Sequence, residues 1–563
     1  MLSLPCRFRR RRILALVAVL AIAMLVAVAC APAAEEAAPA EEEAAPAEEE
    51  AAPAEEEAAP AEEEEAMPAE ECTPTGEVKR GGELVFARRE EPLTLDPAIP
   101  NDNGSIYAIE QIFSALTRPD EDGWGLEPDG AESWDISDDG LVYTFHLREG
   151  AKFSNGDPVT AGDYVFALER GRGPESGFAG IFEAIDTIEA PDDMTVVLTL
   201  KRPYAPILSV ASIFYGAVYP QDVFEADPDG FSSNPVGSGP WMVEEYTRGD
   251  RLVLVPNPHY WELGVDCKPL PYLDKVTILY VPETNSRVLG LRNGDFDAMD
   301  GVPFNEAAAL DAEEGITLHV APIFRLDYIY LNHQNPPLDS KEFRLALNYA
   351  VDRQVILDTV YFGYGEIPNG YWPKMFYHSE DVPLIPYDPD KARELVAESG
   401  YNGEPIEILI AAGDTTFEQT AVILQQFWKE VGINAEIVKN DTGTAFDEIV
   451  AGNYQTSGSY ITSDINDDDE LAILMADISN DTSSFFSWYE NDEAVELLKK
   501  AQSTLDPDER AEYYAQIQEM VYWDGYSVPI NYVPAVNAYA DHVQNWKNIA
   551  PGWWWLRTVW MDQ

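Results

Sequence analysis

The sequence predicts an α/β protein, and three observations support that class. Short, alternating apolar stretches such as 141–147 and 195–200 are typical of strands. Longer stretches with apolar residues every three or four positions, such as 105–116 and 341–360, are typical of amphipathic helices. The two patterns mix throughout the chain, which favours an α/β or α+β arrangement.

The remaining elements are predicted in the same way. One helix runs through Arg170, with Thr160 as its N-cap and Asp163 at the capping-box position. Further strands are expected at 81–87, 251–255 and 434–438, and further helices at 390–398, 416–431, 494–504 and 507–522.

Composition excludes several classes of protein. The chain has 563 residues, of which 46% are hydrophobic and 11% aromatic, enough for a large core and for two to four domains. Its 36 basic and 101 acidic residues give a net charge of −65. A nucleic-acid-binding protein needs a basic surface, and so does a protein held to anionic lipid by charge, so we expect no nucleic-acid partner.

The charge is unevenly distributed. Residues 1–30 carry +5 and residues 31–71 carry −17, which leaves −53 on the remainder. Such self-repulsion is relieved by salt, so adaptation to a saline habitat is one interpretation and a solubility-tuned surface is the other.

The first thirty residues resemble an export signal. Five arginines between 7 and 12 precede an uncharged apolar run at 13–29, and small residues precede Cys30. This pattern is similar to a bacterial lipoprotein signal, with residues 1–29 removed and Cys30 lipidated. An uncleaved membrane helix or a plain secretory signal is the alternative. Each interpretation places the remaining chain outside the cytoplasmic membrane.

A tether is predicted at 30–75. The sequence Ala-Ala-Pro-Ala-Glu-Glu-Glu occurs four times between 37 and 64. Proline in every repeat opposes a helix, and the glutamates repel one another, so we expect an extended, disordered spacer. Two cysteines remain beyond Cys6 and Cys30. Cys72 and Cys267 can form a disulfide in an oxidising compartment, or both can remain free thiols.

A set of motifs in the body resembles one family. The clearest is Asp-Gly-Leu-Val-Tyr-Thr-Phe-His-Leu-Arg at 139–148, followed by Phe-Ser-Asn-Gly-Asp-Pro-Val-Thr-Ala-Gly-Asp at 153–163. Other matching segments are 131–134, 235–241, 257–261, 294–297, 343–353, 387–395 and 399–401. Their order is similar to that of the oligopeptide/dipeptide class of extracellular solute-binding proteins, family 5.

The resemblance implies a periplasmic-binding-protein-like fold (type II, cluster C), pear-shaped, with three lobes and a hinge. Lobe I would comprise 76–119, 235–325 and 525–563, lobe II 120–234, and lobe III 326–524. A peptide or similar small solute would bind between lobes I and III. The protein would then be a monomeric receptor, anchored by lipid, that delivers the solute to the transmembrane subunits of an ABC permease.

The resemblance also implies a ligand site in the segment 459–468. Asp464 matches the acid that pairs with the free amine of a peptide in this family, and an ammonium taken out of water needs such an opposite charge. Asp467 lies in the same loop. Tyr107, Tyr460, Trp488, Tyr489 and Trp553 are expected to line the site, although core packing is an equally good explanation for each of them.

Other interpretations remain open at this point. Tyr replaces a frequent Trp at 460 and Asp a frequent Pro at 468, so a sugar, a nickel complex or an opine could replace the peptide. The loop has the alternating acids of a calcium loop but lacks its glycine and final glutamate. No catalytic, metal-ligand or phosphate-loop motif is found, so we expect no catalytic residues, cofactor or metal. A secreted hydrolase or a tethered adhesin is the alternative of another class.

Overall fold

The computed structural model describes residues 73–100, 102–476 and 486–562. The chain divides into two compact units, Met1–Glu70 and Glu71–Gln563, and every described residue belongs to the second. The predicted leader, Cys30, nearly all of the tether and Cys72 lie outside the described residues. Within the described ranges, no helix is long and apolar enough to cross a bilayer.

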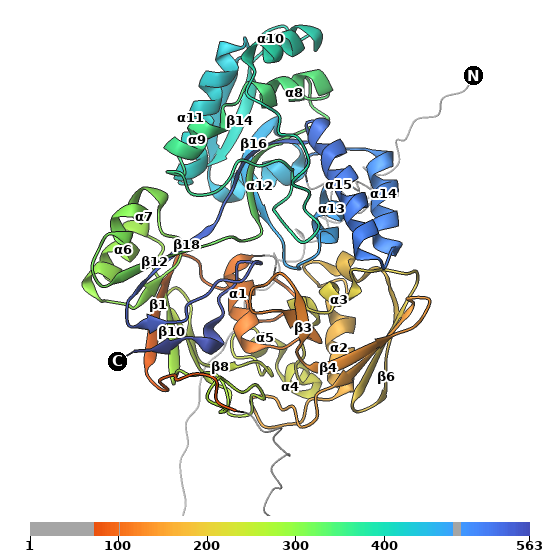
Figure 1. The fold of residues 1–563 in the computed structure, drawn as a ribbon, viewed down its shortest axis with the longest axis vertical. Coiled ribbons are helices and arrows are strands. Elements are labelled where there is room, and N and C mark those ends of the chain that lie inside the picture. Colours follow the sequence, from red (N-terminus) through yellow and green to blue (C-terminus); the bar gives the residue numbers. More distant parts are fainter. Residues whose placement is uncertain (1–72, 101, 477–485, 563) are drawn as a thin grey trace, which may run out of the picture. The chain divides into compact units, whose positions relative to one another are not determined.

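A seven-stranded mixed sheet takes its strands from three separate stretches of the chain (Figure 1). Its order is β12-β18-β11-β1-β10-β9-β8. The strands are β1 (Glu83–Arg88), β8 (Trp241–Thr247), β9 (Arg251–Pro256), β10 (Lys275–Tyr280), β11 (Ala298–Met299), β12 (Ile316–Ala321) and β18 (Ala535–Ala540). β1 is parallel to β10 and β11, whereas the other neighbours are antiparallel. Helices α6 (Thr284–Asn293) and α7 (Phe304–Asp311) pack on it through a core of their own.

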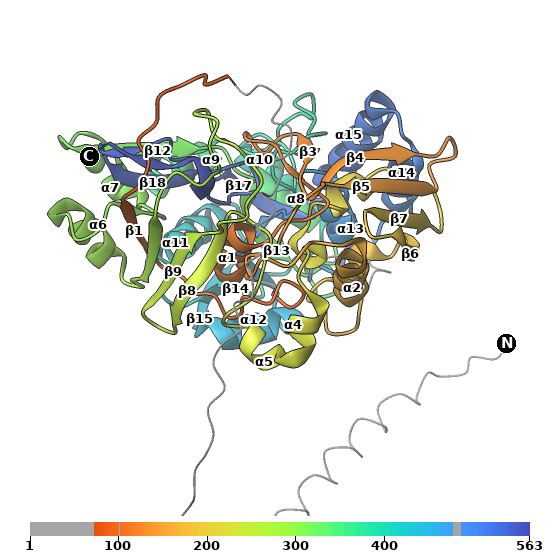
Figure 2. The ribbon, with the colours of Figure 1, turned by 90° about the horizontal axis from the view of Figure 1, so that it is seen from below.

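A four-stranded antiparallel sheet follows in the chain, in the order β4-β5-β7-β6 (Figure 2). Its strands are β4 (Ala131–Ile136), β5 (Val142–Leu147), β6 (Ile185–Asp192) and β7 (Thr195–Leu200). Around it lie the ribbon β2 (Thr117–Pro119) and β3 (Leu126–Pro128) and the helices α2 (Ala161–Gly171), α3 (Ile207–Val210), α4 (Gln221–Ala226), α5 (Pro228–Phe231), η1 (Ala179–Phe182) and η2 (Phe214–Gly216). One continuous apolar core joins this sheet to the first, and it includes the expected core residues Tyr143 and Phe145.

The third sheet has five strands in the order β15-β14-β16-β13-β17. They are β13 (Arg325–Leu331), β14 (Ile406–Ala411), β15 (Ala435–Asn440), β16 (Thr456–Thr462) and β17 (Ser527–Tyr532). The helices that cover it are α8 (Lys341–Tyr349), α9 (Arg353–Thr359), α10 (Pro389–Glu398), α11 (Thr415–Glu430), α12 (Thr442–Ala451), α13 (Asp469–Ala476), α14 (Asp492–Ser503) and α15 (Pro507–Trp523). Two separate cores result, one around α8, α9 and α11 and the other around α13, α14 and α15.

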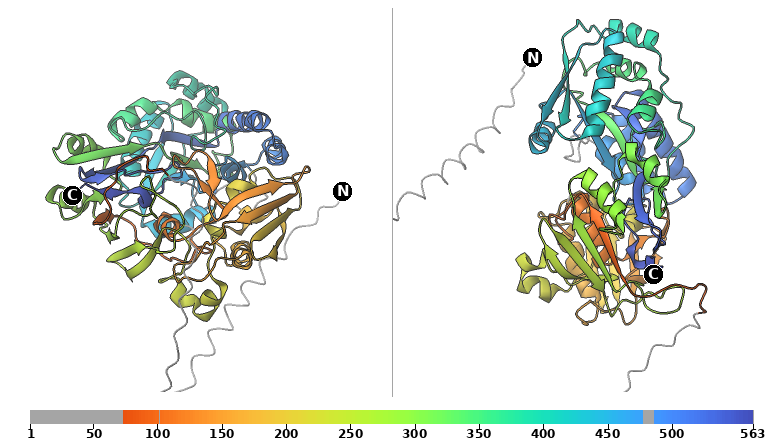
Figure 3. Two further views of the ribbon diagram at one scale, coloured as in Figure 1. Left: turned by 60° about the horizontal axis from the view of Figure 1, so that its bottom comes forward. Right: turned by 90° about the vertical axis from the view of Figure 1, so that its left-hand side faces the viewer.

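The chain passes between the seven-stranded and five-stranded sheets at two neighbouring places (Figure 3). Residues 322–324 connect β12 to β13, and residues 533–534 connect β17 to β18. The two connections lie side by side, because the Val533 amide donates to the Arg325 carbonyl at 3.2 Å. β17 belongs to the five-stranded sheet, so the second passage comes after residue 532, later in the chain than the boundary expected at 525.

Most local predictions are confirmed, and the capping box of α2 is present with both of its hydrogen bonds. Two helices differ. The helix expected at 341–360 is broken into α8 and α9, because the Asp352 side chain accepts from the amides of Gln354 and Val355 and starts a new helix. The helix expected at 105–116 ends at Ile112, whose carbonyl accepts from the amide of Gly239 at 2.9 Å.

The C-terminal segment returns to the core shared by the first two sheets. Its elements are β19 (Val543–Gln544), η4 (Leu556–Thr558) and β20 (Trp560–Met561). Cys267 is disulfide-bonded. Its expected partner, Cys72, is outside the described residues, so the pairing stays a prediction.

Candidate functional site

The loop at 463–468 connects β16 to α13, and its shape is set by Glu470 at the start of that helix. The Glu470 carboxylate accepts from the Ser463 hydroxyl at 2.7 Å and from the backbone amides of Asp464 and Ile465 at 3.0 and 3.3 Å. Ile465 is fully buried in the core of the first two sheets. The hydrogen bonds to Glu470 and the burial of Ile465 therefore fix the backbone on both sides of Asp464.

Asp464 differs from the other acids of this loop. Its side chain is half-buried, and among the described residues no donor reaches its carboxylate. Burial, together with the neighbouring Glu470 carboxyl group, holds the pKa of Asp464 well above its ordinary value. A carboxylate in this situation is stabilised by a ligand that supplies a positive charge.

Asp467, which we expected at the ligand, has a structural role instead. Its two carboxylate oxygens accept from Arg510 of α15 at 2.9 and 3.0 Å, and both side chains are almost fully buried. Arg510 also donates to the hydroxyl groups of Tyr377 and Tyr514. Both oxygens of Asp467 are thus already bonded inside the protein, and their partner lies 43 residues away in the sequence, where no local pattern indicates it.

The next two acids, Asp468 and Asp469, are fully buried. Burial raises the pKa of Asp468 to about 7, although its carboxylate accepts from the Tyr377 amide at 2.8 Å. Burial likewise raises the pKa of Asp469 to about 6, and the Tyr204 hydroxyl donates to it at 2.5 Å.

The calcium-loop interpretation fails on the same contacts. Asn466 donates to the Gly125 carbonyl at 2.7 Å, while Asp468 faces the Tyr377 amide, so the alternating side chains do not converge. Among residues 73–100, 102–476 and 486–562, no group of three or more His, Cys, Asp or Glu side chains could hold a metal ion.

Helix α1 (Asn103–Ile112) carries two side chains three positions apart on one face, Tyr107 and Glu110. Burial raises the pKa of Tyr107, and the nearby Tyr460 contributes to the shift. Burial also raises the pKa of Glu110, and the charge of Asp464 contributes there. Two of the expected residues therefore lie near α1: Tyr460 near Tyr107, and Asp464 near Glu110.

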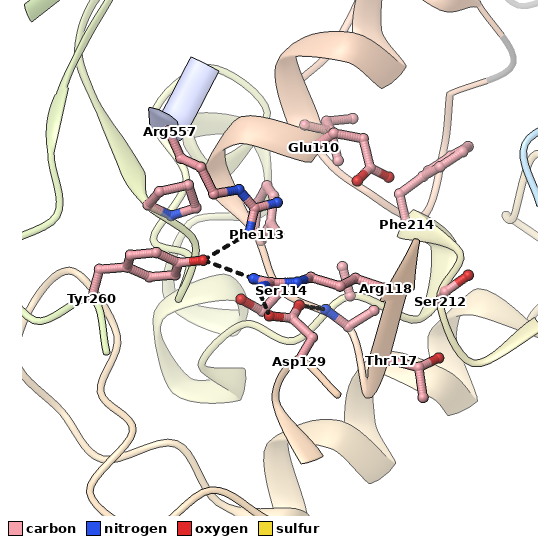
Figure 4. A pocket seen from close by; sticks show the side chains of 14 residues that line it. Glu110, Phe113, Ser114, Thr117, Arg118, Asp129, Ser212, Phe214, Tyr260 and Arg557 are labelled. Carbon is pink, nitrogen blue, oxygen red and sulfur yellow. Dashed lines mark hydrogen bonds and ion pairs between the residues drawn. The ribbon is translucent and has the colours of Figure 1, made fainter. Parts of the chain in front are cut away.

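Glu110 is a residue that the sequence analysis missed. One of its carboxylate oxygens is buried and lacks a hydrogen-bond partner in the described structure. It lines a small cavity of about 20 Å³, enough for one water molecule, and a hydrogen-bonded network contributes Arg118, Asp129, Tyr260 and Arg557 to the same lining (Figure 4). The network consists of Arg118, Asp129, Tyr260, Glu262 and Arg557. An acid set among Ile106, Ile109 and Ile112 of a buried helix was the signal available in the sequence.

Arg325 is the second residue that was missed. Its guanidinium carbon lies 4.1 Å from the centroid of the Tyr460 ring, which is 38% exposed. Its Nε donates to the buried Asp327 at 2.8 Å, and the Tyr361 hydroxyl donates to the same acid at 2.8 Å. Arg and Asp two positions apart lie on one face of a strand, a pattern that could have been recognised.

The other expected aromatic residues contribute to packing. Tyr489 is 2% exposed and its hydroxyl donates to Asp524 at 2.7 Å. Trp553 is also 2% exposed, within the core of the first two sheets. Trp488 is half-buried and lies 6.4 Å from Tyr454, ring centre to ring centre. The burial of Tyr489 and Trp553 favours core packing, the alternative explanation given for both residues in the sequence analysis.

Comparison with known proteins places the chain in a family. Residues 125–483 match the family model described as bacterial extracellular solute-binding proteins, family 5 middle. The chain belongs to this family. One relative of this family 5 protein is the probable D,D-dipeptide-binding periplasmic protein DdpA of Escherichia coli strain K12, which is 30% identical over 481 residues, 81% of this chain and 90% of DdpA.

Solved structures agree with the family 5 assignment. The periplasmic binding protein DppA from Helicobacter pylori, in complex with the peptide STSA, has a TM-score of 0.77 and 27% identity over 86% of this chain and 99% of its own. AgaA of A. tumefaciens R10, in complex with agropinic acid, has a TM-score of 0.76 and 25% identity over 86% of this chain and 99% of its own.

These comparisons confirm three expectations about the family 5 protein. Its fold is that of the type II periplasmic binding proteins. It is a solute-binding protein rather than an enzyme, because its relatives bind solutes. Its relatives are named as extracellular or periplasmic proteins, which is the location expected from the resemblance.

Proposed function

We propose that this protein is the receptor of an ABC importer and captures a short peptide by its free amine at Asp464. The observation that carries the proposal is the Asp464 carboxylate, which has no partner among the described residues although the acids around it are bonded or deeply buried. An ammonium group on the ligand would supply the missing charge and donors.

Peptide is favoured over other solutes by the relatives. DdpA is named as a D,D-dipeptide-binding protein, and DppA was solved with a peptide. The complex of AgaA with agropinic acid supports an opine as the second candidate. Both solute classes are small molecules, and only some of them present a free α-amine.

The three-lobe division accounts for how the ligand would be enclosed. In this proposal lobe I is built on the seven-stranded sheet, lobe II on the four-stranded sheet and lobe III on the five-stranded sheet, and we would set the last boundary after Tyr532 rather than at 525. The two adjacent passages, 322–324 and 533–534, would act as the hinge between lobes I and III. α1 of lobe I and the 463–468 loop of lobe III would then close on the ligand.

The N-terminal features complete the proposal. Cys30 would carry the lipid, and the tether at 30–75 would hold the folded part near the permease. Cys72 would pair with Cys267 and so fasten the end of the tether to the folded part; the hydrogen bond from the Thr75 amide to the Val265 carbonyl at 2.9 Å supports this arrangement. Mass spectrometry of the purified, non-reduced protein measures both modifications.

The function is tested with the full-length protein in detergent. Mass spectrometry first identifies any solute that is retained through purification. Calorimetry then compares trialanine with N-acetyl-trialanine; we expect trialanine to bind and the acetylated peptide to bind at least about 100-fold more weakly, because acetylation removes the charge that faces Asp464. Binding of an opine but of no peptide would move the protein to the second candidate class, and turnover of the peptide would contradict a receptor.

A further inference from the structure

The loop at 463–468 and the first turn of α13 are joined into one segment. The Glu470 carboxylate of α13 accepts from the Ser463 hydroxyl at 2.7 Å and from the Asp464 amide at 3.0 Å. The Asp469 amide, at the start of the helix, donates to the Asp467 carboxylate at 3.0 Å. Because these bonds tie the loop to the helix, Asp464 does not move unless Asp469 moves with it.

Asp469 is bonded to the part of the chain that surrounds the four-stranded sheet. The Tyr204 hydroxyl, from the segment between β7 and α3, donates to Asp469 at 2.5 Å, and the two residues are 3% and 0% exposed. Asp469 also accepts from Gln502 of α14 and from Tyr514 of α15, at 3.4 and 3.3 Å. Gln502 and Tyr514 pack in the same group of helices as α13, so a movement of that group away from the four-stranded sheet would break the bond to Tyr204 and keep the other two.

Two further hydrogen bonds cross between the same two parts of the molecule. The Ala205 amide donates to the Gln502 carbonyl at 2.7 Å, directly after Tyr204 in the chain. The Asn466 side chain donates to the carbonyl of Gly125, beside β3, at 2.7 Å. The loop, α13 and α14 are therefore all fastened to the part of the chain around the four-stranded sheet.

We propose that Tyr204, Ala205 and Asp469 form a latch that holds the loop at 463–468 in place and that opens each time the ligand leaves. The proposal rests on the proposed function and deepens it, since it names the contact that limits how fast the ligand dissociates. A hinge rotation at 322–324 and 533–534 carries α13 away from Tyr204. Water then reaches both the hydroxyl and the carboxylate, so opening leaves no buried polar group without a partner.

The rival explanation is a permanent interface, in which α13 and Tyr204 never separate. The two explanations differ in the exchange of the Ala205 amide hydrogen with solvent, because an amide bonded across the latch exchanges only when the two parts separate. A ligand that keeps the latch closed slows this exchange, whereas it has no effect on a permanent interface. The Lys201 amide, which donates to the Ala184 carbonyl at 2.9 Å beside the same sheet, is the internal control.

The test follows hydrogen exchange in the full-length protein in detergent by mass spectrometry, with fragments that separate Ala205 from Lys201. We expect saturating trialanine to slow exchange at Ala205 by about 10-fold and to leave Lys201 unchanged. If calorimetry shows that trialanine is bound but exchange at Ala205 is not slowed, the proposal is overturned and the proposed function stays intact. If no peptide binds, the proposed function fails and the proposal fails with it.

Variants then assign the effect to the latch. Tyr204→Phe removes only the hydroxyl, and we expect it to speed exchange at Ala205 in the ligand-free protein by about 10-fold. The dissociation rate of trialanine, followed by stopped-flow tryptophan fluorescence, should rise by about the same factor. Tyr513→Phe is the matched control, because it removes a hydroxyl that donates to Glu509 at 2.8 Å on the exposed side of α15, and it should change neither rate. A folded Tyr204→Phe protein in which both rates are unchanged would overturn the proposal.

Discussion

Two halves of one loop use the same residue type for opposite purposes. Asp467 is enclosed with Arg510 and both of its oxygens accept hydrogen bonds, whereas Asp464, three residues earlier, has no partner among the described residues. The difference lies in the neighbours of the two acids. Asp467 is bonded to an arginine from α15, whereas the charge of Asp464 lies near Glu110 of α1. An acidic loop is therefore informative only when its long-range partners are known.

The largest effect is expected at the paired acid. Asp467→Asn should lower the free energy of unfolding by about 3–5 kcal/mol, because the buried charge of Arg510 loses its counter-charge. Urea denaturation at pH 7 measures it. The double variant Asp467→Leu with Arg510→Leu removes both charges and should recover most of the loss. A loss below about 1 kcal/mol for Asp467→Asn would contradict a structural role.

Asp464 should behave in the opposite way. Asp464→Asn should weaken the binding of trialanine by about 3 kcal/mol, because the amine of the ligand loses its only counter-charge in the loop. The free energy of unfolding of the ligand-free protein should not fall and should rise at pH 8, since an unfavourable buried charge is removed.

The exposed Asp390 of α10 provides the matched control for that experiment, because Asp390→Asn changes the total charge equally. Calorimetry on the two variants separates a local effect from a general one. An Asp464→Asn protein with unchanged affinity would remove Asp464 from the site and, with it, the basis of the proposed function.

Whether a feature could be predicted from the sequence depended on how far apart in the chain its contacting residues lie. The capping box of α2 lies within four residues, and the sequence alone predicted it correctly. The family motifs, read in order, predicted the fold and singled out Asp464. The pairing of Asp467 with Arg510 and the approach of Tyr107 to Tyr460 join residues 43 and 353 positions apart, and no local pattern encodes them.

Glu110 and Arg325 were missed for a different reason. Glu110 is the one charged residue of α1, and Arg325 shares β13 with a single further charge, Asp327; the apolar pattern indicated each element while its charged residues were passed over. Such exceptions are informative, because an isolated charge that must be half-buried needs a partner from elsewhere in the molecule or from a ligand. By contrast, Tyr489 and Trp553 followed the general tendency of aromatic residues to pack in the core.

Asp468 should make the free energy of unfolding depend on pH. Burial raises its pKa to about 7 in the folded protein, against an ordinary value of 3.8. Between about pH 4 and pH 7 the unfolded chain has lost a proton that the folded protein keeps, so the free energy of unfolding should fall as the pH rises through this window and level off above it.

Asp468→Asn should reduce the fall between pH 5 and pH 8 by about 2 kcal/mol, roughly half of what the full shift in pKa would give, because the window begins above the ordinary pKa and the structure relaxes. Urea denaturation at pH 5 and pH 8 measures the difference between the two proteins. Asp390→Asn is again the control, and a pH dependence of Asp468→Asn equal to that of the unmodified protein would show that Asp468 does not titrate in this range.

The smallest effects are expected at Tyr489 and Tyr460, two tyrosines that were both expected to line the ligand site. Tyr489→Phe should lower the free energy of unfolding by about 1 kcal/mol, because Asp524 loses one of its donors in a half-buried position, and it should leave the affinity for trialanine unchanged. Tyr460→Ala should change stability less than it changes affinity, since the ring is 38% exposed and supports the guanidinium of Arg325. Denaturation and calorimetry on both variants decide the matter: if Tyr489→Phe weakens binding as much as Tyr460→Ala does, the division between core and site drawn through these aromatic residues is wrong.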